Sequence, residues 1–300
     1  MKRTLPIAAL ALLSAGGCRA TATRAVANAL SSGETSVYAQ DDDPDLVRAA
    51  VPFGLKTMEG LLAEHPEHEG LLTALASGFT QYGYAFVQAD AEEAEMNGKS
   101  VPARVLRERA KRLFLRARDY GLRGLEARHQ GLSGRLRAAR DLKPALAQLN
   151  KDDLPLVYWT AASWALAIGA GKEDMALVAE LPVPGALMKR ALGIDETWNE
   201  GAIHEFLVTW EAAQGGPDGL ARAKEHFDRA IALSKGKKLG VLVSYAEAVS
   251  VARQDRAEFT RLLQQVVRAD AESDRAHRLA NVLAQRRAKL LLAHAEDLFA

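Results

Sequence analysis

The chain has 300 residues with 39 basic and 38 acidic side chains, and it contains a single cysteine. The near balance of charge excludes a globally basic nucleic-acid-binding protein, and one cysteine excludes an intrachain disulfide. The length suits one large domain or two closely packed domains.

The N-terminus has the pattern of a secretory signal. A short basic start precedes an apolar run over residues 5–13, which is too short to cross a bilayer core that needs about 20 residues. Small residues then lead to Cys18 in a pattern that resembles a bacterial lipobox, although Ala15 stands where leucine is usual. The alternative is an ordinary cleaved signal with an incidental cysteine. Acylation of Cys18 is favoured because a lone free thiol outside the cytoplasm is a liability.

These features divide the chain into three parts. We expect a lipoprotein signal peptide at 1–17, an acylated N-terminus and tether at 18–43, and a helical domain at 44–298. The lipid on Cys18 would attach the protein to a membrane without a spanning helix. The residues after Cys18 lack the aspartate associated with inner-membrane retention. We therefore expect an outer-membrane lipoprotein that faces the periplasm.

From Pro44 onward the sequence predicts helices almost without interruption, since alanine and leucine dominate and β-branched alternation is rare. Asp43 followed by Pro44 is typical of a helix start, and His65-Pro66 breaks the first helix. Pro182 and Pro184 are expected to bracket a turn. The next helix begins at Glu69, is apolar and aromatic as far as Ala89, and is closed by Asn97-Gly98. Further helices are predicted at 102–128, 155–169, 184–192, 197–214, 217–234, 238–254, 256–269 and 273–298, with shorter pieces over 131–150. The predicted fold class is all-α.

Two of these helices share a spacing of alanine and phenylalanine. Small residues let helix backbones approach closely, and a phenylalanine between them fills the groove of a neighbouring helix. The same spacing occurs in the second helix of tetratricopeptide repeats, although any alanine-rich packed helix can produce it. We predict repeat-like helical hairpins that form a compact superhelical domain. The residues concerned are Ala110, Phe114 and Ala117, and again Ala223, Phe227 and Ala230.

Several longer stretches together resemble one known family, the T-components of TRAP transporters. These are tetratricopeptide-repeat lipoproteins associated with tripartite ATP-independent periplasmic transport systems. The resemblance extends from about residue 40 to the C-terminus. It is carried by residues 41–48, 52–56, 78–88, 158–164, 233–237, 245–248 and 281–299.

The resemblance implies a periplasmic, membrane-anchored and non-catalytic protein that forms a homotrimer. It also implies a partner, the periplasmic solute-binding protein of a TRAP system, and a cavity or pore for small, hydrophobic ligands. The alternative is a scaffold of the cell envelope that binds no ligand. A hydrolase ranks third, because no nucleophile–base pair can be named from the spacing.

The sequence contains none of the motifs that carry catalysis, phosphate binding or metal binding, so no enzyme activity, cofactor or metal is predicted. His65 and His68 flank a helix break, where a solvated loop is favoured over a metal site. His204 lies among Trp198, Phe206 and Trp210 on one predicted helix. We expect a packed, hydrogen-bonded histidine there in preference to a catalytic base.

Aromatic side chains are the candidate ligand-cavity residues. Core packing explains most of them, and lining of an apolar cavity is the functional alternative. We predict that at least Tyr82, Tyr158 and Trp159 converge on one pocket. The full candidate set is Tyr82, Phe86, Tyr158, Trp159, Trp164 and Trp198.

Arginines cluster over 104–118 and 123–140, and a smaller group lies over 286–289. Acidic residues interleave with or follow these arginines, so we expect ion-paired, solvated faces and no nucleic-acid binding. A docking surface for an acidic partner is the alternative.

Overall fold

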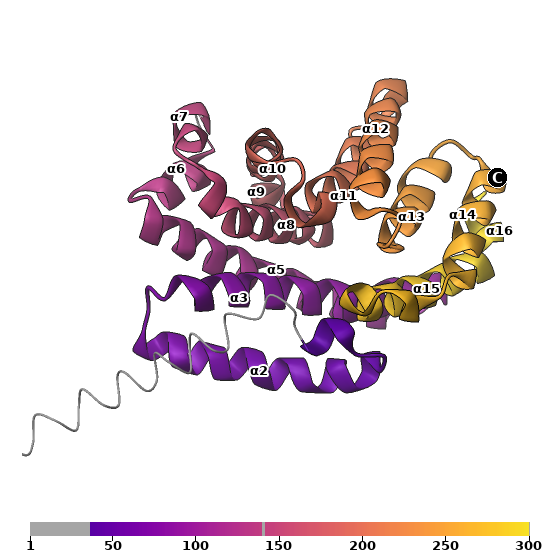
Figure 1. Cartoon of the computed structure of the whole chain (residues 1–300), viewed down its shortest axis with the longest axis horizontal. Coiled ribbons are helices and arrows are strands. Elements are labelled where there is room, and N and C mark those ends of the chain that lie inside the picture. The colour runs from indigo at the N-terminus through magenta and orange to yellow at the C-terminus, as the bar shows by residue number, and fades with distance from the viewer. Residues whose placement is uncertain (1–36, 140–141, 300) are drawn as a thin grey trace, which may run out of the picture.

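The computed structural model describes residues 37–139 and 142–299, and every regular element in these two ranges is helical, which confirms the predicted all-α fold (Figure 1). The first half contains η1 (Val37–Gln40), α2 (Pro44–Glu64), α3 (Glu69–Tyr82), η2 (Gly83–Gln88), α4 (Ala89–Met96), α5 (Ser100–Arg128), α6 (Leu132–Ala138) and α7 (Leu142–Ala147).

The second half begins with η3 (Lys151–Asp153), α8 (Leu154–Ala170), α9 (Met175–Val178), α10 (Pro182–Ile194), α11 (Trp198–Ala213) and α12 (Gly216–Ser234). It ends with α13 (Gly240–Tyr245), η4 (Ala246–Ser250), α14 (Arg256–Arg268), η5 (Ala271–Ser273), η6 (Arg275–His277), α15 (Arg278–Ala293) and α16 (Ala295–Leu298). None of the helices in the described ranges is both long and apolar enough to cross a membrane.

The start of α2 shows how the local sequence sets a helix boundary. The Asp43 carboxylate accepts hydrogen bonds from the backbone N–H groups of Asp45 and Leu46, at 3.0 and 3.1 Å. Pro44 stands in the first turn, where a missing N–H group has no consequence. Helix α2 therefore begins at the residue that the sequence predicted.

The long helix α5 is the centre of the N-terminal half and packs between α3 and α8. A Cβ atom at Gly121 would collide with Thr160, and one at Gly124 would collide with Leu156. These two glycines therefore allow α5 and α8 to cross closely. Phe114, also on α5, is fully buried, and its ring lies directly against the backbone of Gly83.

The two alanine–phenylalanine spacings occupy different environments. Ala110, Phe114 and Ala117 on α5 have no exposed surface, as the repeat-like packing requires. On α12, Ala223 is also buried, but Phe227 is only partly buried and packs against Tyr245, with ring centroids 4.3 Å apart. Short connections join α2 to α3 and α11 to α12, so these helices form antiparallel hairpins.

Some element boundaries differ from the prediction. The expected turn between Pro182 and Pro184 is wrong, because both prolines lie in the first turn of α10, where their missing N–H groups are tolerated. The helix predicted at 238–254 divides into α13 and the π-helical η4. The helix predicted from Glu69 is interrupted by the π-helical η2, although it ends at Met96, where the predicted stop at Asn97-Gly98 places it. Residues 273–277 form short 3-10 turns before α15 begins.

The helix predicted at 197–214 is interrupted near its start. Asn199, Glu200 and Gly201 have φ values of 47°, 53° and 82°, which lie in the left-handed region. The turn places Trp198 on Tyr158 and turns the carbonyl of Asn199 toward Lys238, whose Nζ donates to it at 2.7 Å. This irregular turn therefore positions side chains of two elements.

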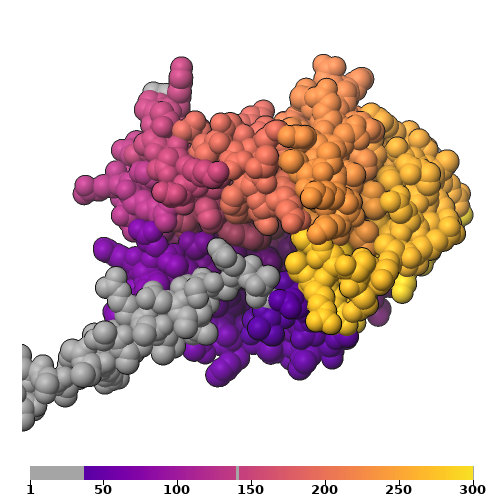
Figure 2. Space-filling model, viewed as in Figure 1, coloured from indigo at the N-terminus to yellow at the C-terminus, as the bar shows by residue number. Residues whose placement is uncertain are grey.

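The last helices pack back on the first ones. Helix α15 contacts η1 and α2. Arg278 forms an ion pair with Asp42 at 2.7 Å, and Arg286 lies 3.4 Å from Asp45. In the space-filling view, the C-terminal segment (yellow) covers one end of the molecule and touches both the N-terminal helices (indigo) and the later ones (orange) (Figure 2). The two ends of the described helical chain thus meet.

Candidate functional site

Tyr84 combines two properties that a tyrosine on an open surface does not combine. Its side chain is 53% exposed. Nevertheless, burial by the surrounding protein strongly raises the pKa of its phenol, and the nearby carboxylate of Glu247 raises this pKa further. Both observations agree when the accessible side of the ring faces a concave region, with protein on several sides of it. We call this concave region, which Tyr84, Tyr158, Glu205 and Glu247 face, the interior space.

Tyr158 and Glu205 face the same region. Burial raises the pKa of Tyr158, and the charge of Glu205 raises it further, as does the neighbouring Tyr84. Burial also raises the pKa of the Glu205 carboxyl, although 31% of that side chain is accessible. The interior space is therefore bounded by η2 (Tyr84), α8 (Tyr158), α11 (Glu205) and, as described next, η4.

The two π-helical segments of the described structure meet at this space through Arg287 of α15. Arg287 donates from Nη2 to Glu247 of η4 at 2.5 Å and pairs with Glu92 of α4 at 2.9 Å. Gln88, at the end of η2, donates to Glu92 at 2.8 Å. π-Helical turns leave a helix locally irregular and occur frequently at functional sites. Here, one guanidinium group connects two of them.

Opposing effects act on the pKa of the Glu247 carboxyl at the interior space. Burial raises its pKa, while the charge of Arg287 and the hydrogen bond from it lower the pKa. The net direction is upward, so the surroundings of Glu247 disfavour a bare negative charge even beside a guanidinium. This agrees with an interior that contains more carboxylates than cations.

Aromatic rings form one wall of the site. The ring centroids of Tyr158 and Trp159 are 5.0 Å apart in an edge-to-face arrangement, and those of Tyr158 and Trp198 are 4.8 Å apart. Trp198 reaches Tyr158 because of the left-handed turn that follows it. This arrangement combines flat apolar surface with the polar tip of Tyr158, which is typical of small-ligand sites.

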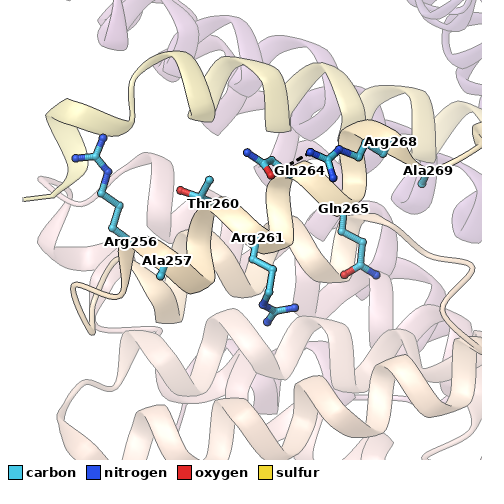
Figure 3. A pocket seen from close by; sticks show the side chains of 8 residues that line it. All are labelled: Arg256, Ala257, Thr260, Arg261, Gln264, Gln265, Arg268 and Ala269. Carbon is cyan, nitrogen blue, oxygen red and sulfur yellow. Dashed lines mark hydrogen bonds between the residues drawn. The ribbon is translucent and has the colours of Figure 1, made fainter.

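A second surface feature is a shallow groove of about 990 Å³ along the outer face of α14 (Figure 3). Arg256 pairs with Glu296 there, and Arg268 donates to Gln264 at 3.3 Å. Arg261 contacts no acidic side chain within the described ranges. The groove has no acidic residue in its lining, which consists of Arg256, Ala257, Thr260, Arg261, Gln264, Gln265, Arg268 and Ala269.

Comparison with known proteins places the chain in a family. The model of the family described as TRAP transporter T-component matches residues 40–299. The chain belongs to this family. An uncharacterized protein of Treponema pallidum (strain Nichols) is 28% identical over 274 residues, which cover 88% of this chain and 83% of that protein. The family match agrees with the resemblance found in the sequence and makes the chain a component of a TRAP transport system, in a family of transport accessories.

The structure of this T-component places the predicted aromatic residues in three groups. Tyr158, Trp159 and Trp198 lie together at the interior space. Tyr82 and Phe86 form a buried pair with ring centroids 5.6 Å apart. Trp164 is fully buried, and its indole N–H donates to Glu180 at 2.7 Å. The convergence of Tyr82 with Tyr158 and Trp159 on one pocket stays a prediction, and Cys18 lies outside the described residues.

Sequence reasoning missed Tyr84, Glu205, Glu247 and Arg287. Each of the charged residues stands at a helical position that looks like part of a solvated face. Tyr84 lies two positions from both Tyr82 and Phe86, which were predicted to line a cavity. In a regular α-helix two positions correspond to a rotation of about 200°, so Tyr84 would point to the opposite face. The available signal was the pair Gly83-Tyr84 in an otherwise strongly helical segment, which marks the start of η2.

His204 is a buried, hydrogen-bonded side chain, 6% exposed. Its Nδ1 atom lies 2.9 Å from Nδ1 of His226 on α12, and its Nε2 atom lies 3.3 Å from Glu196. The Glu196 carboxylate accepts a hydrogen bond, so Nε2 of neutral His204 carries the proton and its Nδ1 atom is an acceptor. In the hydrogen bond between the two neutral histidines, the donor is therefore Nδ1–H of His226. Within the described ranges, no three histidine, cysteine or acidic side chains are grouped to hold a metal ion.

This histidine pair predicts a loss of stability on acidification. Burial lowers the pKa of His204 and of His226 below the ordinary value. As pH falls below about 6.5, these two histidines bind protons in the unfolded chain but stay neutral in the folded chain. The free energy of unfolding therefore decreases with falling pH, until the pH lies below the pKa values of both histidines in the folded chain. The charged groups that act on the pair are Glu196, Arg229, Glu211, Glu225 and Lys189.

The measurement is urea unfolding of the natural protein and of His226→Gln at about pH 7.5 and about pH 5. We expect the unfolding midpoint of the natural protein to fall more steeply with acid than that of His226→Gln. His65→Gln, a change at a helix break, serves as the matched control and should keep the steeper dependence. Equal slopes for the natural protein and His226→Gln would contradict the prediction.

Proposed function

We propose that this protein is a lipid-anchored accessory of a TRAP-type transport system that binds the solute-binding protein and receives a small ligand in its interior space. The observation that carries the proposal is the interior space itself, where Tyr84 and Glu205 are accessible and yet surrounded by protein. A scaffold without a ligand has no use for accessible polar groups inside its fold. Membership in the T-component family supports the transport role.

The proposal includes an anchored, periplasm-facing and trimeric form. Acylation of Cys18, export and outer-membrane attachment follow from the N-terminal sequence pattern. The homotrimer follows from the family resemblance. The alternative, an envelope scaffold that binds no ligand, predicts that the interior space takes up no small molecule.

We assign the α14 groove to the solute-binding protein. Its three arginines offer donors to carboxylates, and in the described part of the chain Arg261 has no acidic partner that docking would displace. A partner face rich in aspartate and glutamate matches this charge. Because the groove lies outside the interior space, docking there leaves the ligand site free.

The docking surface is tested by co-purification from solubilised membranes of cells that produce the tagged, full-length protein. We expect the solute-binding protein of the TRAP system to co-purify with the natural chain. The variant Arg256→Glu/Arg261→Glu/Arg268→Glu should recover about tenfold less of it, since like charges would then face each other. The matched control changes three exposed arginines of α5, Arg104, Arg109 and Arg112, to glutamate and should retain the partner. Equal loss from both variants would exclude the α14 groove as the docking site.

The anchor is tested at Cys18. In Cys18→Ser the acyl chains have no attachment point, and we expect most of the protein to move from the membrane pellet to the soluble periplasmic fraction. Mass spectrometry of the natural protein should find the N-terminus at an acylated Cys18. Release of a protein that begins elsewhere, with an unmodified Cys18, would support the ordinary signal peptide.

A further inference from the structure

The charges that surround the interior space point to the class of ligand, and this inference rests on the proposed function. Glu92, Glu205 and Glu247 contribute three carboxylates, while Arg287 and Lys238 contribute two cations. His277 also acts on Glu205, and it is paired with Glu200 and Asp274. With His277 neutral, the formal balance of the five other groups is one negative charge in excess. In a concave region, such an excess attracts a positively charged guest and repels an anion.

Arg287 is not free to receive an anionic ligand. Its Nε and Nη2 atoms are both engaged by Glu247, at 3.1 and 2.5 Å, and Nη2 also pairs with Glu92. Its remaining donor, Nη1, is buried and therefore out of reach of a guest in the interior space. The guanidinium group thus serves to neutralise two carboxylates of the protein itself.

Glu205 is the carboxylate that lacks a donor. The nearest cation, Nζ of Lys238, is 3.9 Å away, beyond hydrogen-bond distance, and Lys238 instead donates to the carbonyl of Asn199 at 2.7 Å. Within the described ranges no other group donates to the Glu205 carboxylate. Burial raises the pKa of Glu205, in agreement with a carboxylate that receives no hydrogen bond from the described residues. A donor from a ligand would supply the missing hydrogen bond.

The rings beside Glu205 suit an organic cation. Tyr84 presents more than half of its surface, and Tyr158 stands against Trp198 and Trp159. The faces of such rings carry partial negative charge and attract ammonium groups, most strongly where water is excluded. Their apolar area also accommodates a hydrocarbon body.

We propose that the interior space binds a small organic amine in its protonated form, with Glu205 as the counter-ion and Tyr84 and Tyr158 as aromatic walls. The amine would donate to the carboxylate that now lacks a donor. The apolar part of the ligand would lie against the Tyr158 and Trp198 rings.

The test uses three probes of similar size and different charge: phenethylamine, 2-phenylethanol and 3-phenylpropionate. Binding to the mature full-length protein is followed by ligand-observed NMR and by the fluorescence of Trp159 and Trp198, which adjoin the site. We expect phenethylamine to bind at least about tenfold more tightly than phenylethanol, and phenylpropionate to bind most weakly.

Two variants locate the site. Glu205→Gln keeps the size of the side chain and removes its charge, so phenethylamine should bind about tenfold more weakly while phenylethanol binds as before. Glu64→Gln, at the exposed end of α2, should change neither affinity. The thermal unfolding midpoint of each variant confirms that it is folded.

The outcomes separate this inference from the function on which it rests. If phenylethanol or phenylpropionate binds as tightly as phenethylamine, the assignment of an amine is wrong, although a ligand site in the interior stands. If Glu205→Gln leaves the affinity for phenethylamine unchanged, Glu205 is not the counter-ion and the proposal is overturned. If none of the three probes binds, both the amine and the ligand-receiving interior are refuted, whereas the co-purification experiment still decides the partner.

Discussion

Replacing Phe114 by alanine is expected to lower the free energy of unfolding by about 3–5 kcal/mol. The ring is completely buried on α5 and supports the backbone of Gly83, where η2 begins. Its removal leaves a cavity that the surrounding helices cannot fill, because α5 is already in close contact with α3 and α8. Urea unfolding followed by far-ultraviolet circular dichroism measures the change.

The control for Phe114→Ala lies on the same helix. Val105 is 62% exposed, so Val105→Ala should alter the free energy of unfolding by no more than about 0.5 kcal/mol. A loss below about 1 kcal/mol for Phe114→Ala would show that the site collapses around the missing ring, and the assignment of Phe114 as a supporting residue for η2 would then be wrong.

Replacing Arg287 by methionine is expected to cost about 1–3 kcal/mol near neutral pH. The change leaves Glu247 and Glu92 without their cation at the interior space. The loss is smaller than for a fully buried pair, since about a third of each carboxylate side chain is accessible. The double variant Arg287→Met/Glu247→Gln should lose less than the sum of the two single changes.

The pH dependence of this loss has a definite sign. Burial raises the pKa of Glu247 even with Arg287 present, and removal of the guanidinium would raise it further. Protonation of Glu247 removes its unpaired charge, so the deficit of Arg287→Met should shrink as pH falls from about 7.5 toward about 5.5. Arg286→Met, at the next position of α15 and 3.4 Å from Asp45, is the matched control and should cost about 0.5 kcal/mol or less. A deficit that grows on acidification would contradict the pairing described here.

The sequence predicted the helical framework well because its signals are local. Asp43 and Pro44 mark the start of α2, and the spacing of Ala110, Phe114 and Ala117 identifies a face that is buried in the structure. The stretch that resembles the T-component family coincides with the range that the family model matches. These features depend on residues within a few turns of one another.

The interior space could not be predicted in the same way. It depends on Tyr84, Glu205 and Arg287, which are 121 and 82 residues apart along the chain and meet only because α15 packs back toward the first helices. The left-handed turn at Asn199 also escaped prediction, since Trp-Asn-Glu-Gly is compatible with a continuing helix. Long-range closure and unusual backbone angles leave little trace in a single sequence.

The two π-helical turns have a consequence for how this chain can change during evolution. A π-turn is equivalent to an α-helix with one residue inserted, so deletion of one residue from η2 or η4 would restore a regular helix. Each residue of an α-helix advances the chain by about 100°, so such a deletion would rotate Tyr84 or Glu247 away from Arg287 while it left the helix intact. A gain or loss of one residue at these two places would thus alter the lining of the interior without altering the architecture around it.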